Sequence, residues 1–182
     1  MIVQQHSERH DKGLISVVND CLEDMGGSPD GFDRISPSAQ SLSLAKTYDG
    51  RTDACSFVAV QMMHGAEGGY DLKVIGHAYV FPCEELEGDM ALGIHVMRPW
   101  QRKKIGHALV QRVLEWVVEK KHAFIRMTTL KTNLRSQAFF ASMGFEVENH
   151  FTWKDGNMIP REMGPHVYMR WTAPVVGAEI PR

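Results

Sequence analysis

One strongly amphipathic stretch, which follows Gly106, stands out in the pattern of apolar and polar positions. Apolar residues three and four positions apart share one face of a helix. In this stretch they are Leu109, Val110, Val113, Leu114, Val117 and Val118. Polar residues occupy the positions between them, namely Gln111, Arg112, Glu115, Glu119 and Lys120. The pattern predicts a helix that packs one side on a core and leaves the other in water.

Three more helices are expected from capping residues and apolar spacing. The first starts at Ser7 or Asp11, both good N-cap residues, and ends at the turn Gly26–Pro29. Its apolar face is formed by Leu14, Val18, Cys21, Leu22 and Met25. The second runs from Ser36-Pro37 to Asp49-Gly50, and the third covers Asn133–Met143 with Gly144 as its stop.

Runs rich in β-branched and aromatic residues predict the strands. They are Met1–Gln5, Ala54–Met63, Tyr70–Phe81, Met90–Arg98, Phe124–Leu130, Phe145–Trp153 and His166–Trp171. A link with three glycines joins the second and third runs as a hairpin, and Lys154–Pro165 is expected to be a loop. The strand–helix–strand unit from Met90 to Leu130 predicts a right-handed crossover between parallel strands.

These elements together predict an α+β fold, in which helices flank a central, mixed and twisted β-sheet. A chain of 182 residues is long enough for one domain with a real core. We expect that domain to cover residues 1–172 and residues 173–182 to form a flexible C-terminal tail.

Composition narrows the class of protein. The chain has 43% hydrophobic and 23% charged residues and a formal net charge of −2, which argues against bulk nucleic-acid binding. Its three cysteines form no C-x-x-C pair, which favours a reducing compartment. No apolar run approaches the ~20 residues that span a bilayer, and the N-terminus does not resemble a signal peptide. We therefore expect a cytoplasmic protein with no nucleic-acid or membrane partner.

Candidate chemistry gathers where the amphipathic helix begins. Arg98, Arg102, Lys103 and Lys104 crowd the turn that enters it, and Gly106 allows a ligand to approach the backbone closely. A helix N-terminus presents unpaired N–H groups and the positive end of the helix dipole. The charge run alone fits a solvated loop, but the combination predicts an anion site.

The same residues carry a resemblance to a known family. Gln101–Gly106 resembles the Q/R-x-x-G-x-G/A pyrophosphate loop of the GNAT superfamily, the acetyl-CoA-dependent N-acetyltransferases. Ile105–Leu109 is similar to that family's G-I-G-x-A-L helix start. Asn133–Phe145 resembles its N-x-R-A-x-x-x-Y-x-x-x-G-F segment. The resemblance is specific from about Asp89 to Phe145 and implies a single GNAT-like domain.

The resemblance implies acetyl-CoA as co-substrate. Backbone N–H groups from Arg102 to Ala108 would hold its pyrophosphate, and the strand edge at Val96 and Met97 would pair with its pantetheine amides. An N–H near Val96 would polarise the thioester carbonyl. The full set of residues implied to bind the cofactor is Ile94, Val96, Met97, Gln101, Arg102, Lys103, Lys104, Ile105, Gly106, His107, Ala108, Asn133 and Phe140.

Two residues depart from the family pattern. Lys104 replaces the first glycine of the loop and lacks its conformational freedom. Phe140 stands where the family often has a tyrosine that protonates the leaving thiolate, so water or one of Tyr79, Tyr168 and Ser142 would have to donate that proton. Asn133 has two compatible interpretations, contact with the pantetheine arm or capping of its helix.

The general base is open between His95 and two acidic residues near the start of the same strand. An alkylamine with a pKa near ~10.4 must lose a proton before it attacks. His95 has a suitable intrinsic pKa on the predicted thioester strand, and Asp89, like Glu87, would act through water. A core histidine with satisfied bonds is the plainer interpretation of both His95 and His77. The nine histidines show no metal-ligand spacing, so no metal is expected.

The prediction is therefore acetyl transfer from acetyl-CoA to a primary amine by direct attack in a ternary complex. A covalent acyl-cysteine route is disfavoured because Cys21 and Cys55 lie far from the motif in sequence and no histidine is placed to activate them. The alternative is a weakly active or inactive acyl-CoA-binding module, suggested by Lys104 and Phe140. The acceptor, a small molecule or a protein amine, and the oligomeric state stay open.

Overall fold

The computed structural model describes residues 1–24, 53–64, 69–82, 90–148, 150–152, 158–160 and 166–174. Its elements are β1 (Ile2–Gln5), η1 (Glu8–His10), α1 (Asp11–Asp24), β2 (Cys55–His64), β3 (Tyr70–Pro82), β4 (Met90–Val96), η2 (Arg98–Trp100), α3 (Ile105–Glu119), β5 (Phe124–Leu130), α4 (Leu134–Ser142), β6 (Glu146–Val147), β7 (His150–Thr152), β8 (Met158–Pro160) and β9 (His166–Thr172). The expected second helix, at 36–50, lies outside the described residues.

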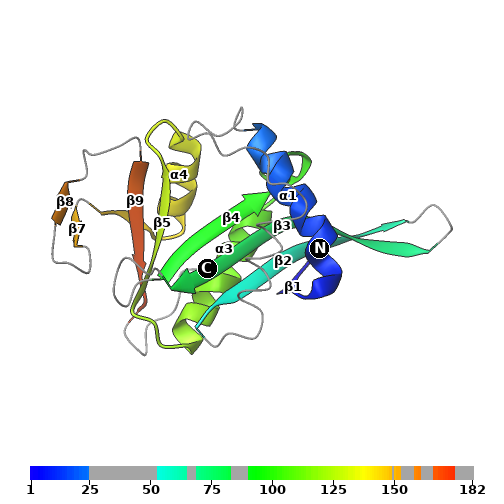
Figure 1. The fold of residues 1–182 in the computed structure, drawn as a ribbon, viewed down its shortest axis with the longest axis horizontal. Helices are drawn as coiled ribbons and strands as arrows, with labels where there is room; N and C mark the ends of the chain where they lie inside the picture. Colours follow the sequence, from blue (N-terminus) through cyan, green and yellow to red (C-terminus); the bar gives the residue numbers. More distant parts are fainter. Residues whose placement is uncertain are drawn as a thin grey trace. The chain divides into compact units, whose positions relative to one another are not determined.

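Seven strands form one mixed sheet in the order β1-β2-β3-β4-β5-β9-β6 (Figure 1). The pairs β1–β2, β2–β3, β5–β9 and β6–β9 are antiparallel, whereas β4 and β5 are parallel. Helix α3 connects the two parallel strands. The predicted α+β class, with a mixed sheet and a strand–helix–strand crossover, is confirmed.

A second, two-stranded sheet pairs β7 with β8. Strand β8 falls within 154–165, so the prediction of a loop over that whole stretch is wrong. The sequence does carry a turn signal there, because Asp-Gly pairs such as Asp155-Gly156 are common between strands. Three-residue strands show too little alternation to stand out from their turn residues.

Helix α3 confirms the amphipathic prediction with one correction. Leu109, Val110, Val113, Leu114 and Val117 are at most 1% exposed, whereas Val118 is 36% exposed. Eight residues exceed two helical turns by about 80°, so Val118 is rotated away from Val110 toward solvent. Trp116, which the pattern did not single out, is buried instead. None of the helices in the described ranges is long and apolar enough to cross a membrane.

The contacts divide the chain into two compact units, Met1–Val80 with Gly93–Val113 and Phe81–Leu92 with Leu114–Arg182. In the first unit, α1 and α3 cover opposite faces of the β2–β3 hairpin (Figure 1). A bulge between Ala59 and Val60 puts Val74 and Gly76 on opposite faces. A Cβ added to Gly13 of α1 would lie 2.6 Å from Val74, and one added to Gly76 would lie 2.9 Å from Leu109 of α3.

The α1 side of this unit holds a buried cluster that reaches the end of β4. It consists of Val17, Val58, Val60, Val74 and Met97, with Trp100 packed against it. Val17 and Leu14 are the most buried residues of α1, while the side chains expected to continue this face, Leu22 and Met25, lie outside the described part. Ser7 does not cap α1 directly, because its N–H and hydroxyl bond His10 Nδ1 at 3.0 Å within the preceding turn.

In the second unit, β5 and β9 pair from Phe124↔Thr172 to Leu130↔His166. The pairing continues one residue further, since Ala173 N–H donates to Ala123 O at 2.8 Å. The tail that the sequence predicts from residue 173 therefore begins with a paired residue. Helix α4 starts and stops as expected, because Asn133 caps it and Gly144 follows it with a φ of +85°.

Candidate active site

The end of β4 is paired on the edge that faces β3. Met97 N–H donates to Ile75 O at 3.0 Å, and N–H groups alternate between the two edges of a strand, so Val96 N–H faces the edge away from β3. In the described residues, the register between β4 and β5 holds only Ala91 and Arg126. Met97 O also accepts a bond, from Trp100 N–H at 2.8 Å. Of the two positions expected to meet pantetheine, Val96 has the outward N–H and Met97 has both backbone groups engaged.

The loop after β4 has an unusual backbone. Arg102 and Lys104 both have a φ of 61°, in the left-handed region that favours glycine. Lys104 stands at the glycine position of the loop motif, so the lysine adopts the conformation that a glycine there would take. Lys104 therefore keeps the positive φ that a glycine would have at this position. The conformation costs lysine about 1–2 kcal/mol of local strain.

The start of α3 presents unpaired donors. The first i→i−4 bond runs from Ala108 N–H to Lys104 O at 3.0 Å. The N–H groups of Ile105, Gly106 and His107 consequently have no partner within the helix. Among the expected donors from Arg102 to Ala108, Ala108 uses its own N–H inside α3.

The side chains of the loop divide into an anchor and a charged rim. Ile105 is 3% exposed, whereas Arg102, Lys103 and Lys104 are exposed. Lys103 Nζ lies 4.8 Å from the centroid of the Trp100 ring, which packs on the core cluster. Three cations beside three outward N–H groups suit a diphosphate in charge and in donor chemistry.

His95 lies on the α1 side of β4, in a stack of rings. Its ring is 6.4 Å from that of His77 and 6.1 Å from that of Tyr79, at angles of 8° and 18°. Burial lowers the pKa of His95 to about 4, and its Nδ1 is buried without a partner among the described residues. The Tyr79 ring packs directly over Gly93 of β4, where a side chain would collide with it. His95 is thus neutral at pH 7 and has Tyr79 as its neighbour.

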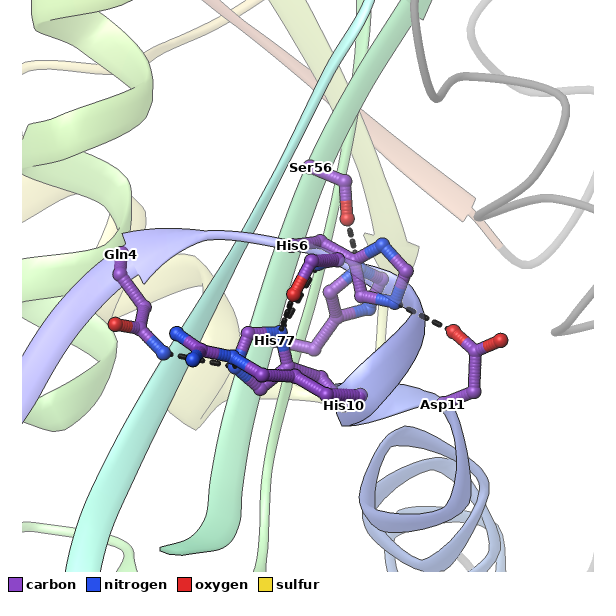
Figure 2. A network of polar contacts seen from close by, with 8 residues as sticks. Gln4, His6, His10, Asp11, Ser56 and His77 are labelled. Carbon is purple, nitrogen blue, oxygen red and sulfur yellow. Dashed lines mark hydrogen bonds and ion pairs between the residues drawn. The ribbon is translucent and has the colours of Figure 1, made fainter.

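The interior beside these rings is polar, as Figure 2 shows. His77 Nε2 lies 2.8 Å from Ser56 Oγ, and His6 Nε2 lies 2.8 Å from Asp11 Oδ1. Burial is the largest cause that holds the pKa of His77 well below 6.5. The interpretation of His77 as a core histidine with satisfied hydrogen bonds holds for Nε2. It does not hold for Nδ1, which is buried without a partner in this part of the chain. No group of His, Cys, Asp or Glu in the described ranges is arranged to hold a metal ion.

The remaining predicted site residues are Asp89, Asn133 and Phe140. Asp89 lies outside the described residues. Asn133 and Phe140 belong to the second unit, where Asn133 Oδ1 accepts from Ser136 N–H at 3.0 Å and Phe140 is 1% exposed between Phe139 and Phe145. Among the proposed substitute proton donors, Ser142 donates to Phe139 O at 2.6 Å. The capping and core interpretations of Asn133 and Phe140 are therefore confirmed.

Comparison with known proteins shows which protein family the chain belongs to. The model of the acetyltransferase (GNAT) family matches residues 32–145, which is most of the chain. The chain belongs to the GNAT family. No curated protein matches it in sequence.

Solved structures share the GNAT fold at low sequence identity. Ribosomal-protein-alanine N-acetyltransferase from Brucella melitensis is 20% identical, with 94% of this chain and 99% of that chain covered and a TM-score of 0.69. The protein yncA from Salmonella typhimurium, solved with its cofactor acetyl-CoA, is 14% identical over 98% and 97%, with a TM-score of 0.70. The paia N-acetyltransferase from Thermoplasma acidophilum, in complex with coenzyme A, is 16% identical over 94% and 98%, with a TM-score of 0.69.

Sequence reasoning missed the part that α1 takes in this site. Cys21 Sγ donates to Val96 O at 3.3 Å, and Asp20 Oδ2 accepts from Arg98 N–H at 2.5 Å. Cys21, which is far from the motif in sequence, thus contacts it in space, where its thiol donates a hydrogen bond. No local pattern could reveal these contacts, because 75 and 78 residues separate the partners.

Proposed function

We propose that this GNAT protein transfers an acetyl group from acetyl-CoA to a primary amine by direct attack in a ternary complex. The observation that carries the proposal is the left-handed backbone at Arg102 and Lys104, which leads into the unpaired N–H groups of α3. The choice of ligand is supported by the two similar structures solved with acetyl-CoA and with coenzyme A.

Each part of the co-substrate has a proposed contact. The N–H groups of Ile105, Gly106 and His107, with the cations of the loop, bind the pyrophosphate. The backbone of Ile94 and Val96 pairs with the pantetheine arm, and Val96 N–H, which faces away from β3, stabilises the oxyanion. Acetyl-CoA supplies the activated thioester that the amine attacks.

Proton transfer is assigned to the α1 side of β4. His95 is neutral at pH 7, so it can accept the proton of the amine, but a pKa of about 4 makes it a weak base. Asp89 is therefore kept as the second candidate. Tyr79, packed over Gly93 beside His95, is the substitute we propose for the hydroxyl that Phe140 lacks.

Three measurements, made one after the other, test this function. Isothermal titration should show that CoA binds at micromolar concentration and that binding weakens with salt. A panel of amines should then release free CoA thiol from acetyl-CoA, and labelled acetyl-CoA with mass spectrometry should identify the acetylated acceptor. Absence of CoA binding at millimolar concentration would end the proposal.

A binding module without turnover is the second candidate. The specific observation behind it is Phe140, which is buried in an aromatic cluster and offers no proton to a leaving thiolate. This alternative predicts tight acetyl-CoA binding with no thiol release for any amine. Turnover that falls in a Tyr79→Phe variant, with CoA affinity unchanged, would decide for the enzyme.

A further inference from the structure

The turn between β4 and α3 is held by three side chains, two of them from α1. Asp20 and Cys21, on the last turns of α1, bond the backbone of Arg98 and Val96. Gln101, at the end of the turn, donates from Nε2 to the same Val96 carbonyl at 3.1 Å. Every one of these residues belongs to the first unit. Three side chains thus hold the segment from Val96 to Gln101, which contains the short helix η2.

Asp20 supplies a cap that the local sequence does not provide. Helix η2 begins at Arg98, and the preceding residue, Met97, has no side-chain oxygen to accept its first N–H groups. Pro99 removes one of these donors, since proline has no N–H. The Arg98 N–H remains, and the Asp20 carboxylate accepts it at 2.5 Å. The first N–H of η2 is therefore capped by a side chain of α1.

The braced segment lies between the two proposed contacts with CoA. Val96 N–H is the proposed oxyanion contact, and the N–H groups of Ile105–His107 are the proposed pyrophosphate contacts. One ligand molecule can engage both only if their separation matches its length, and a misplacement of about 1 Å can cost 10²-fold in rate. A carboxylate close to an anion site would by itself repel phosphate, so a role of Asp20 as a ligand is excluded.

We propose that Asp20 is a positioning residue that sets the spacing between the thioester contact at Val96 and the pyrophosphate loop, through its bond to Arg98 N–H. The inference rests on the proposed function, because it assumes that CoA occupies both contacts. It follows that Asp20 acts on ligands that bridge the two contacts and not on ligands that occupy the loop alone. A residue that only stabilised the fold would not make this distinction.

The test compares two ligands by isothermal titration on the full chain. Coenzyme A spans both contacts, whereas 3′-phosphoadenosine 5′-diphosphate carries the diphosphate without pantetheine. Asp20→Ala should raise the Kd for CoA about tenfold and that for the shorter ligand less than about twofold, since only the bridging ligand needs the spacing. Asp20→Asn keeps an oxygen acceptor and should restore the CoA affinity to within about threefold of the wild type.

Asp11→Ala is the matched control. It removes another carboxylate of α1, one that pairs with His6 and makes no contact with the turn in the described structure. It should lower the melting temperature and leave the ratio of the two Kd values unchanged. Equal rises in both Kd values for Asp20→Ala, or a ratio equal to that of Asp11→Ala, would overturn the inference and leave the proposed function intact. If the wild type binds neither ligand, the proposed function falls first and the inference falls with it.

Discussion

Replacement of Lys104 by glycine should stabilise the fold. The φ of Lys104 is 61°, a conformation that costs a residue with a Cβ about 1–2 kcal/mol. Glycine removes this cost but adds freedom to the unfolded chain worth about 0.4–1 kcal/mol. The central values of the two ranges leave a gain of about 0.8 kcal/mol in the free energy of unfolding. For a chain of this length that gain raises Tm by about 1–4 °C.

Two control variants separate the backbone from the charge. Lys104→Ala removes the same cation but keeps the strained φ, so the difference between the two variants isolates the backbone. Lys121→Gly tests the same strain elsewhere, because Lys121 also has a φ of 61°. It follows α3 in a Schellman arrangement, in which Lys121 N–H donates to Val118 O and His122 N–H to Val117 O. The Lys121→Gly variant should gain similar stability with no change in CoA affinity.

Thermal unfolding followed by circular dichroism measures the stability. Titration with CoA at two salt concentrations measures how much the charge of Lys104 contributes to CoA affinity. Both variants of Lys104 should lose CoA affinity to a similar degree, and the loss should shrink at high salt. If Lys104→Gly melts no higher than Lys104→Ala, the lysine is not strained and our account of the loop is refuted.

Three further predictions concern the two units separately. Burial lowers the pKa of His95 from 6.5 to about 4, so the unfolded chain binds more protons between these pH values and stability should fall as the pH drops through them. The loss is at most about 3 kcal/mol in the free energy of unfolding, and urea unfolding at several pH values should show a smaller loss for His95→Gln. Glu148 bonds Arg126 through both oxygens, at 2.5 and 2.9 Å, and Arg170 at 3.2 Å. Glu148→Ala should therefore cost about 2–3 kcal/mol in urea unfolding, more than Glu148→Gln, which keeps one acceptor. Asn133→Ala should cost about 1 kcal/mol through loss of the α4 cap, while Asn133→Asp keeps that stability; a loss of CoA affinity in both would assign the amide to pantetheine as well.

The elements that bear the site were predictable because their signals are local. The helical spacing from Leu109 to Val117 predicts α3 with its buried side, and Asn133 and Gly144 mark the two ends of α4. The position that we propose for the pyrophosphate also follows from a local signal, the basic turn from Gln101 to Gly106 that leads into a helix. The β7–β8 pair was missed because strands of three residues carry almost no periodic signal.

What the sequence alone determined, then, is where the longer helices and strands form and where we propose an anion site, because both follow from spacing, capping and charge within about ten residues. The tertiary structure decided the rest. Lys104 takes a glycine conformation because the surrounding fold compensates its strain, and His95 is neutral because its neighbours across the sheet exclude water. Asp20 reaches Arg98 across 78 residues because α1 packs on the core cluster beside the end of β4. Such contacts depend on how separate elements pack in space, and no spacing along the chain encodes that packing.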